Sequence, residues 1–318
     1  ASILGNTTTF AGNEIAILLD GGTASVTQNS LYDNGVAIKA INGGSLTALY
    51  GNTFEGGETR DDNDTDLLIA ATAGTINLGT GNAFAGDVNY IDNQSTQSFD
   101  LTANNTTFDQ ASPYVIENLV YHKVDDAALG LVRTAAGAIY VTQQSGSIQR
   151  GIDAANAGET VYVGAGTYNE PVVVNKAVTV VGAGKAQTTI TQGLSLSAMV
   201  DGAHVQQLRD LSVVANSSPY IGDTYYAIRI DATAGDTAPV RLDNVLARSP
   251  FTSVYGAGLF VTPNGHVVTD VQINGSTFDG SWTHGMFVKN SVGASGSLTH
   301  LVVTDTTFDN NNAKGGTS

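Results

Sequence analysis

A short phrase that ends in Phe or Leu recurs along the chain, and it constrains the fold more than any other feature of the sequence. The phrase is rich in Asn and Thr, and it follows an alternating apolar and polar run such as SLTALYGNTF or THLVVTDTTF. Its last residues are Phe10, Leu31, Phe54, Phe84, Phe108, Phe278 and Phe308. The separations are 21, 23, 30 and 24 residues across the first five positions, and 30 residues across the last pair.

Each repeat of this phrase predicts one coil of a stacked structure. The alternation has the period of two residues that is typical of a half-buried strand. Gly and Asn within the run supply the left-handed or tight-turn conformations that a corner requires. One such unit cannot bury its apolar face alone, whereas stacked coils of about 20–30 residues can do so in a parallel β-solenoid. The Phe side chains should then stack at about 4.8 Å per coil. The alternative is a β-sandwich, but the repeats lack the hairpin turns of that fold.

The composition excludes several classes of protein. The formal net charge is −16, and only 13 Lys and Arg residues are present, so the sequence predicts no nucleic-acid partner. No cysteine is present, which excludes disulfides, thiolate metal sites and cysteine nucleophiles. No stretch approaches about 18 consecutive apolar residues, and membrane insertion is therefore not expected.

The repeat is interrupted between residues 112 and 146 and begins again at Ser147. The stretch PYVIENLVYHKVDDAALGLV has apolar residues at mixed three- and four-residue spacing, which predicts a helix, or a helix followed by a strand. Ser147 is a candidate N-cap, and Ile148, Ile152 and Ala155 share one face of a short helix. The segments TVYVG, PVVVNK and AVTVVGAG then predict three strands.

The segment from Ser147 to Gly184 resembles the N-terminal cap and first coils of the pectin-lyase-like superfamily of right-handed parallel β-helices. The resemblance implies an amphipathic helix that closes the open end of a solenoid, and a GTY-E turn that leads into the first coil. The later coils resemble the superfamily only in their general sequence pattern. The stretch VIENLVYHKVDDAALGLVRTAAGAIYVT resembles junctions in long bacterial surface proteins that contain several β-helices in tandem.

We therefore predict an all-β chain that forms a right-handed parallel β-helix, or solenoid. It should contain two stacked or consecutive β-helix segments, with a short capping helix where the second begins. The predicted domains are the C-terminal coils of a first β-helix (residues 1–111), a connector (112–146), and the cap and coils of a second β-helix (147–318).

Enzymes of the resembling superfamily act on polysaccharides, which makes catalysis an alternative to consider. Their motifs, such as QDTL, NTDG and GHG, do not occur in this sequence. Asp279 and His284, beside Trp282, are candidates for acid–base work, with a solvated corner as the alternative. Two Arg–Asp pairs at i,i+2 spacing share a strand face, which predicts surface ion pairs: Arg229 with Asp231, and Arg241 with Asp243. No column of carboxylates is evident, and we predict that the chain is not an enzyme.

The segment RDDNDTD, at residues 60–66, contains the candidate metal ligands. Asp62, Asp64 and Asp66 alternate with Asn63 and Thr65, a spacing that can place oxygen ligands around Ca²⁺. The full EF-hand loop is absent, because no Gly stands at its sixth position and no Glu at its twelfth. A hydrated turn between coils is the alternative interpretation.

The expected function is that of a structural extracellular scaffold. The chain would be a segment or repeat unit of a large bacterial surface protein, stalk, adhesin or filament, secreted or held at the cell surface. Its strand-like start at Ala1 and its ending NNNAKGGTS favour a piece of something longer. The expected partners are neighbouring copies or adjacent β-helix segments, joined end to end, and also polysaccharide. The alternatives are a polysaccharide-active enzyme of the pectin lyase or esterase type, and a carbohydrate-binding module.

Overall fold

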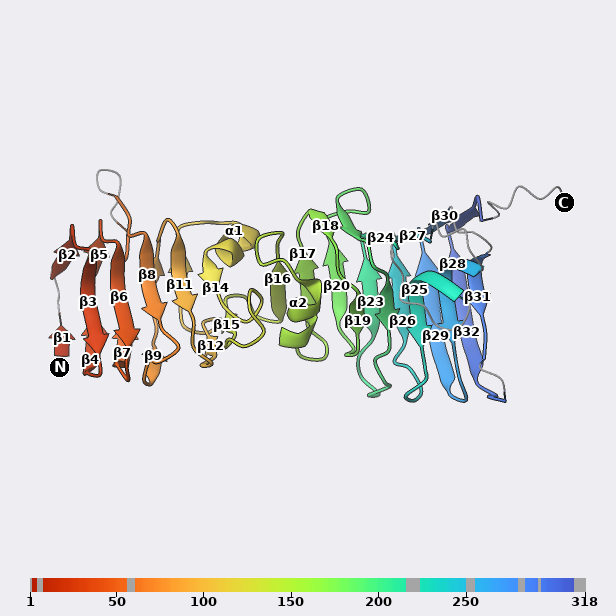
Figure 1. Ribbon diagram of the computed structural model, residues 1–318, viewed down its shortest axis with the longest axis horizontal. Helices are drawn as coiled ribbons and strands as arrows, with labels where there is room; N and C mark the ends of the chain where they lie inside the picture. Colours follow the sequence, from red (N-terminus) through yellow and green to blue (C-terminus); the bar gives the residue numbers. More distant parts are fainter. Residues whose placement is uncertain are drawn as a thin grey trace. The chain divides into compact units, whose positions relative to one another are not determined.

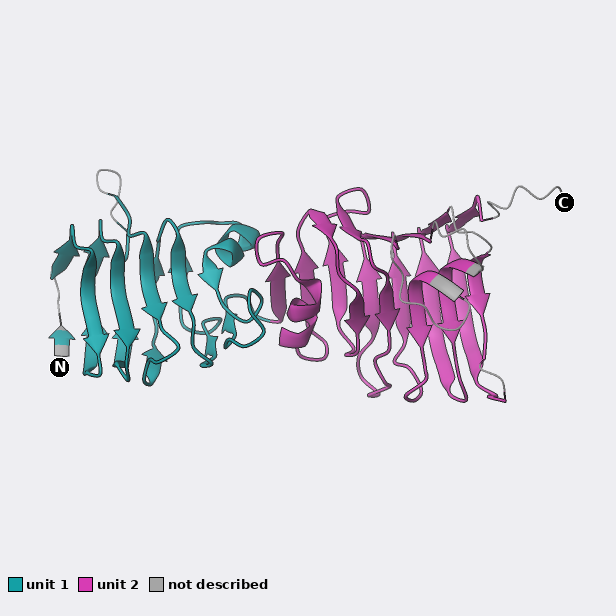
Figure 2. Cartoon of the chain, viewed as in Figure 1, with its two compact units in different colours: residues 1–136 teal, residues 137–318 magenta. Residues whose placement is uncertain are grey.

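The structure is a computed structural model that describes residues 2–4, 8–55, 61–215, 224–249, 255–279, 284–290 and 293–311. Its contacts form two compact units, residues 1–136 and 137–318 (Figures 1 and 2). Helix α1 (Pro113–Asn118) belongs to the first unit and α2 (Ile148–Ala154) to the second. Arg60, Trp282 and the two predicted joining ends, Ala1 and 312–318, lie outside the described residues. The end-to-end joint and the domain bounds 1–111, 112–146 and 147–318 remain predictions.

Three sets of parallel strands build the first unit, and successive strands along the chain alternate among them. The first sheet contains β1 (Ser2–Leu4), β4 (Thr23–Thr27), β7 (Ser45–Tyr50) and β9 (Ile76–Leu78). The second set contains the pairs β2 (Thr9–Ala11) with β5 (Ser30–Tyr32), and β10 (Ala83–Phe84) with β13 (Thr107–Phe108); single bridges through Thr53 connect them. The third sheet contains β3 (Ile15–Asp20), β6 (Val36–Ile41), β8 (Thr65–Ile69), β11 (Asn89–Asn93) and β14 (Val120–Tyr121). A further parallel pair joins β12 (Phe99–Asp100) to β15 (Val132–Arg133).

The second unit repeats this plan with three longer parallel sheets. The first sheet orders β16 (Ala138–Val141), β17 (Thr160–Val163), β20 (Thr179–Gly182), β23 (Gln206–Arg209), β26 (Val240–Asp243), β29 (Val267–Asn274) and β32 (Ser297–Thr304). The second orders β18 (Gly166–Tyr168), β21 (Thr188–Ile190), β24 (Ser212–Val214), β27 (Leu246–Arg248), β30 (Thr277–Asp279) and β33 (Thr307–Asp309). The third orders β19 (Val172–Val174), β22 (Leu194–Leu196), β25 (Thr224–Asp231), β28 (Tyr255–Thr262) and β31 (His284–Val288).

This arrangement confirms an all-β chain of parallel sheets and is compatible with a parallel β-helix. From β17 onward every third strand pairs with the same sheet, so three strands make one coil. Every strand pair among the described residues is parallel, and the one antiparallel contact is an isolated bridge between Met199 and Thr237. A β-sandwich would require antiparallel neighbours, and that alternative is therefore excluded.

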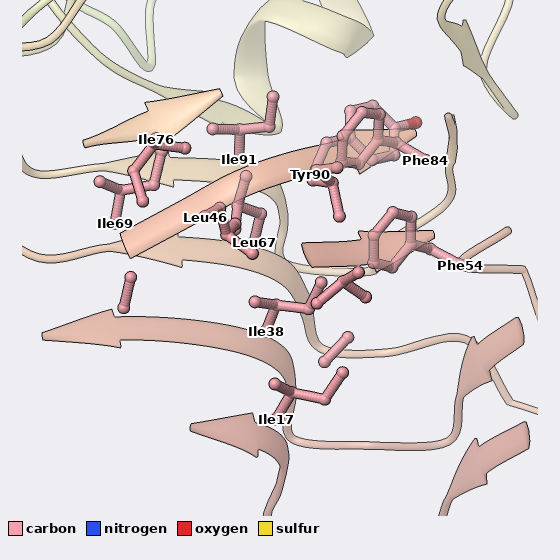
Figure 3. Packing of buried hydrophobic residues seen from close by; sticks show 14 of the residues in the cluster. Ile17, Ile38, Leu46, Phe54, Leu67, Ile69, Ile76, Phe84, Tyr90 and Ile91 are labelled. Carbon is pink, nitrogen blue, oxygen red and sulfur yellow. The ribbon is translucent and has the colours of Figure 1, made fainter. Parts of the chain in front are cut away.

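The repeated Phe residues stack from coil to coil, as the sequence predicted. In the first unit the ring centroids of Phe54 and Phe84 lie 5.0 Å apart, and those of Phe84 and Phe108 lie 5.9 Å apart. Figure 3 shows Phe54, Phe84 and Tyr90 at one end of the apolar cluster that also contains Ile38. In the second unit Phe278 stacks on Phe308 at 5.0 Å. In three successive coils of the first unit and in two of the second, one aromatic position per coil thus adds ring-to-ring contact between neighbouring coils.

A left-handed residue stands at the corner before each repeated phrase from Leu31 onward, and at the equivalent corners before β24 and β27. The corner residues in the first unit are Gln28 (φ 57°), Gly51 (64°), Gly81 (72°) and Asn105 (46°). Those in the second unit are Asp210 (55°), Asn244 (52°), Gly275 (57°) and Asp305 (47°). This region of backbone space favours Gly, Asn and Asp, which explains the composition of the repeated phrase.

Buried asparagines follow or adjoin the corners and form two ladders along the first unit. Asn29 Nδ2 donates to Asn52 Oδ1 at 3.2 Å, and Asn52 Nδ2 donates to Asn82 Oδ1 at 3.1 Å. In the second ladder Asn34 Nδ2 donates to Asn63 Oδ1 at 2.8 Å. The same amides also donate to backbone carbonyls of neighbouring coils, so turns that lie outside the strands still have bonded backbone groups.

Helix α2 closes the start of the second unit. Its predicted N-cap is confirmed, because the Ser147 side chain accepts a hydrogen bond from the backbone N–H of Arg150. The predicted apolar face is also confirmed, since Ile148, Ile152 and Ala155 are buried. Gly151 lies so close to β16 that an added Cβ would stand 2.4 Å from a methyl carbon of Val141. The helix therefore packs directly on the first coil.

Charged side chains from the first coil hold both ends of α2. At the N-terminus the Glu170 carboxylate accepts from Ser147 Oγ at 2.8 Å and from the backbone N–H of Ile148 at 2.5 Å. At the C-terminus Lys176 Nζ donates to the carbonyl oxygens of Asp153 and Ala155, each at 2.8 Å. An anion at the N-terminus and a cation at the C-terminus both complement the helix dipole. Glu170 is the Glu of the GTY-E turn.

Two glutamines cover strand edges that the helix itself does not pair. The side-chain amide of Gln149 accepts from the backbone N–H of Val173 at 2.7 Å and donates to its carbonyl at 3.2 Å. It therefore bonds to β19 as a neighbouring strand would. Gln143 Nε2 donates to the carbonyl of Thr167 in β18 at 3.1 Å. Exposed edges invite pairing with other chains, and these amides remove part of that tendency from the first coil.

The Asn ladder predicts a large loss of stability for Asn52→Ala. This change removes a fully buried amide that makes bonds to two other asparagines and to the carbonyls of Val26 and Tyr50. We expect the free energy of unfolding to fall by about 3 kcal/mol, because buried polar partners remain unsatisfied. Urea denaturation measures the loss. Asn77→Ala, at an exposed position with one bond to Thr47, is the control and should change it by less than about 1 kcal/mol. Equal losses in the two variants would contradict the ladder's role.

Candidate functional site

The structure places the three predicted calcium ligands in different environments. Asp66, in β8, is fully buried, whereas Asp64 is exposed and Asp62 is half-buried. The Asp66 carboxylate accepts hydrogen bonds from Asn63 Nδ2 at 2.9 Å and from the backbone N–H groups of Ala85 and Gly86 at 2.8 and 2.9 Å. A Cβ at Gly86 would stand 3.2 Å from Cγ of Asp66 and 2.4 Å from the Asn89 carbonyl, so this approach requires glycine. Asp66 thus ends the Asn34–Asn63 ladder and binds the next coil.

Acidic residues gather around this segment without forming a recognisable metal centre. The pKa of Asp87 is raised by burial and by the negative charges of Asp62 and Asp64. Within the described parts of the chain, no three His, Cys, Asp or Glu side chains form a group that could hold a metal ion. Both oxygens of Asp66 already accept hydrogen bonds. Calcium binding by Asp62, Asp64 and Asp66 stays a prediction.

The predicted Arg–Asp pairs have different outcomes. Arg229 Nη2 lies 2.9 Å from Asp231 Oδ1, as the spacing suggested, but the Arg229 side chain is 9% exposed, so the prediction of a surface pair was wrong. Arg241 pairs with Asp270 of the next coil at 2.5 Å instead of with Asp243, whose carboxylate accepts from Gln207. The register partner of Arg241 in the next coil is Gln272, two residues after Asp270, so a diagonal neighbour one coil away replaces the i+2 residue.

Asp279 and His284, the candidates for acid–base work, each have another neighbour. Asp279 forms an ion pair with Arg248 of the preceding coil. The His284 ring stacks on Phe287 with centroids 4.6 Å apart. The ion pair of Asp279 connects two strands of the second unit, and the ring of His284 packs on its own strand. Both side chains therefore make structural contacts.

A polar pocket on the surface of the first unit was not predicted from the sequence. Its volume is about 430 Å³. We call it the β11–β14 pocket, and it is lined by Asn89, Asp92, Gln94, Tyr121, Asp126 and Leu129. Asp92 and Tyr121 are register partners on the adjacent strands β11 and β14, which places both side chains on the same face of the sheet.

A buried histidine shapes the wall of the β11–β14 pocket. His122 Nδ1 accepts from the backbone N–H of Val132 at 3.0 Å, so the ring proton is on Nε2, which donates to Glu117 Oε1 at 3.1 Å. The His122 carbonyl accepts from the backbone N–H groups of Asp125 and Asp126, at 2.9 and 3.0 Å. These bonds fold the turn that carries Asp126 into the wall.

The electrostatic character of the pocket is acidic. Asp92 Oδ2 accepts from Gln94 Nε2 at 2.9 Å, while Asp92 Oδ1 is buried without a hydrogen-bond partner. Burial raises the pKa of Asp92. Asp126 Oδ1 accepts from the backbone N–H of Ala128 at 2.9 Å. Tyr121 is 40% exposed and presents an aromatic ring beside these carboxylates. Two carboxylates, two amides and a ring can bind a hydrogen-bond donor, preferably a cationic one.

Comparison with known proteins gives no family, since no family model, no curated protein and no solved structure matches the chain. Among the described helices, neither α1 nor α2 has the length and apolar character needed to cross a membrane. The assignment of function therefore depends on the geometry of the chain itself.

The buried Asp66 predicts a specific dependence of stability on pH. Burial raises its pKa to about 8 from 3.8, against the three donated hydrogen bonds. Between about pH 4 and pH 8 the folded state then holds a proton that the unfolded state has released, so this group's contribution to stability falls as pH rises. In Asp66→Asn that part of the slope should disappear, as measured by urea denaturation from pH 4 to pH 9.

The matched control for this prediction is Asp64→Asn, at an exposed position two residues away. It should keep the pH slope of the parent protein. Asp66→Asn will also shift the whole curve by a constant amount, because Asn63 Nδ2 then faces another amide group. Parallel pH profiles for the parent and Asp66→Asn would show that Asp66 does not titrate in this range.

Proposed function

We propose that this chain is a structural segment of a large secreted or cell-surface protein, most simply of a bacterial one. In this proposal the two units are right-handed parallel β-helices of the pectin-lyase-like type, and they serve as a stalk, adhesin or filament scaffold. The right hand follows from the strong preference for right-handed connections between parallel strands. The acidic, cysteine-free composition suits a soluble exported scaffold.

The observation that carries this proposal is the use of polar side chains to join one coil to the next. Asn52, Asn63 and Asp66 bond to other coils in the first unit. Arg241 with Asp270, and Arg248 with Asp279, do so in the second. A catalytic centre needs side chains directed at a substrate, whereas these side chains are directed at the neighbouring coil.

The first and last described coils of the second unit differ in how far their apolar side chains are covered. One core column runs through seven register partners: Ile139, Val161, Val180, Leu208, Leu242, Ile273 and Val303. The first six are at most 4% exposed, but Val303 is 41% exposed. Leu301 and Phe308, in the same last coil, are exposed to a similar degree. The first coil is covered by α2, and the last described coil can add a further coil from a neighbouring segment or a second copy.

Self-association through this last coil is the first prediction of the scaffold proposal. The protein should associate as its concentration rises, which light scattering after size-exclusion chromatography measures. Val303→Lys places a charge in the exposed core column and should shift the apparent mass to that of a monomer, because inward charges block edge pairing. Thr53→Lys adds the same charge at an exposed position of the first unit and should leave association unchanged. Association that persists in Val303→Lys would place the contact elsewhere.

A polysaccharide assay tests the proposal against its enzymatic alternative. Incubation with polygalacturonate, with and without calcium, should release neither unsaturated nor saturated oligouronides, because no described column of carboxylates faces a substrate. Release is followed by ultraviolet absorbance and by reducing ends. Sustained release above a heat-denatured control would reject the scaffold function in favour of a lyase or hydrolase.

A further inference from the structure

We propose that Asn264 is a site of spontaneous deamidation, a modification that converts its side-chain amide to a carboxylate through a cyclic imide. Asn264 lies in the turn between β28 and β29, and the residue that follows it, Gly265, is exposed. The modification is independent of the scaffold proposal, since it needs neither a partner nor assembly.

Deamidation needs a backbone nitrogen that can reach the side chain of the preceding residue. The Gly265 nitrogen would form a bond to Cγ of Asn264, and the bond from Cγ to Nδ2 would break. The Gly265 amide proton would leave with Nδ2 as ammonia. Water then opens the imide at either of its carbonyl carbons, which gives aspartate or isoaspartate. Glycine favours the first step because it has no Cβ to obstruct the approach.

The chain contains four Asn-Gly sequences, and the structure distinguishes them by the glycine N–H. Their asparagines are Asn34, Asn42, Asn264 and Asn274. Three of the glycines donate to a carbonyl of a neighbouring coil: Gly35 to Asn13 at 2.9 Å, Gly43 to Thr72 at 2.7 Å and Gly275 to Thr304 at 3.2 Å. The Gly265 N–H has no hydrogen-bond partner among the described residues. Its nitrogen is therefore the one that no bond restrains.

The turn at residues 41–44 is a close match to the turn at residues 263–266. Each is closed by a hydrogen bond from the backbone N–H of its last residue to the carbonyl of its first, at 2.7 and 3.0 Å respectively. The φ angles of the two central residues are 49° and 82° in the first turn, and 49° and 93° in the second. Both are thus turns whose central Asn and Gly are left-handed, so backbone conformation does not separate the two sites.

The side-chain amides do not separate the two sites either. Asn42 Nδ2 donates to Asp20 Oδ1 at 3.0 Å, and Asn264 Nδ2 donates to Thr233 Oγ1 at 2.9 Å. Each asparagine is therefore bonded once to the preceding coil through its amide nitrogen. The bond from the following glycine to the next coil, present at Gly43 and not at position 265, is the difference that remains.

Protection should follow from this difference. A glycine nitrogen that is bonded to another coil can attack only after the turn opens locally, whereas Gly265 needs no such opening. An added Cβ at Gly265 would find no atom within 4 Å, but one at Gly35 would stand 2.8 Å from the Glu14 carbonyl oxygen. Asn34 is also buried in its ladder. We therefore expect Asn264 to react first and Asn34 last.

The product would loosen the contact between two coils. Thr233 Oγ1 donates to Asp231 Oδ1 at 2.5 Å, so it can only accept from the residue at position 264. A carboxylate there has no proton to donate and would face the hydroxyl lone pair. Isoaspartate would in addition lengthen the backbone of the turn between β28 and β29.

Peptide mass spectrometry tests the proposal on the folded protein, incubated at mildly alkaline pH and digested after increasing times. The peptide that contains Asn264 should gain the mass of one deamidation at least about fivefold faster than the peptide that contains Asn42, because one backbone hydrogen bond protects Gly43. Aspartate and isoaspartate forms of the peptide should separate by chromatography.

The same incubation in concentrated guanidinium chloride is the control. There the four asparagines should react at similar rates, since each precedes a glycine and the fold no longer protects any of them. In the folded protein, Asn264→Gln should remove the early product and leave the other sites unchanged, because a longer side chain closes a less favourable ring. Equal rates at Asn264 and Asn42 in the folded protein, no reaction at Asn264 while the unfolded chain reacts, or the same preference in guanidinium chloride would each overturn the proposal.

Discussion

The structure depends on the need to satisfy backbone groups where the chain leaves one strand and enters the next. Within the sheets each N–H and carbonyl finds a partner in the neighbouring coil, but the corners interrupt that pattern. A left-handed residue makes the corner before each repeated phrase from Leu31 onward, and its N–H bonds to the adjacent coil, as Gln28 does to Tyr50 at 3.0 Å and Gly51 to Thr80 at 3.0 Å. The buried amide that follows, such as Asn52, donates to further carbonyls. Because each corner binds the corresponding corner of the next coil, the coils must stay in register.

The register then determines which side chains meet. The alternation of each strand fixes the apolar columns that were expected from the sequence, and the recurring Phe became a real stack because its distance from the corner is constant. The N-cap at Ser147 and the apolar face of α2 could also be predicted from the sequence, since capping and helical spacing are local signals. The contacts of Glu170 and Lys176 with the two ends of α2 depend on the coil that follows the helix. They require the fold before they can be recognised.

The candidate site was harder to predict because its residues meet across coils of unequal length. Asp92 and Tyr121 are 29 positions apart, whereas Leu68 and Asp92 are 24 apart, yet both are register partners. No fixed period in the sequence could pair them. The D-x-D-x-D spacing could not predict the different environments of the three carboxylates, because it gives their order in the sequence and not their burial. Asp66 faces inward at the start of β8, while Asp64 remains in the preceding turn.

The acids of this chain therefore divide according to what their oxygens bind. Asp66 and Glu170 accept backbone N–H groups, so their position is fixed by the stacking of coils and by the helix that closes the second unit. Glu117 fixes His122 and, through it, the turn that carries Asp126. Asp92 is the exception, since one of its oxygens is buried and still lacks a donor. Asn29 Oδ1, at the start of its ladder, is also buried without a hydrogen-bond partner, so the stacking of coils that bonds the corner amides still leaves single polar atoms unsatisfied.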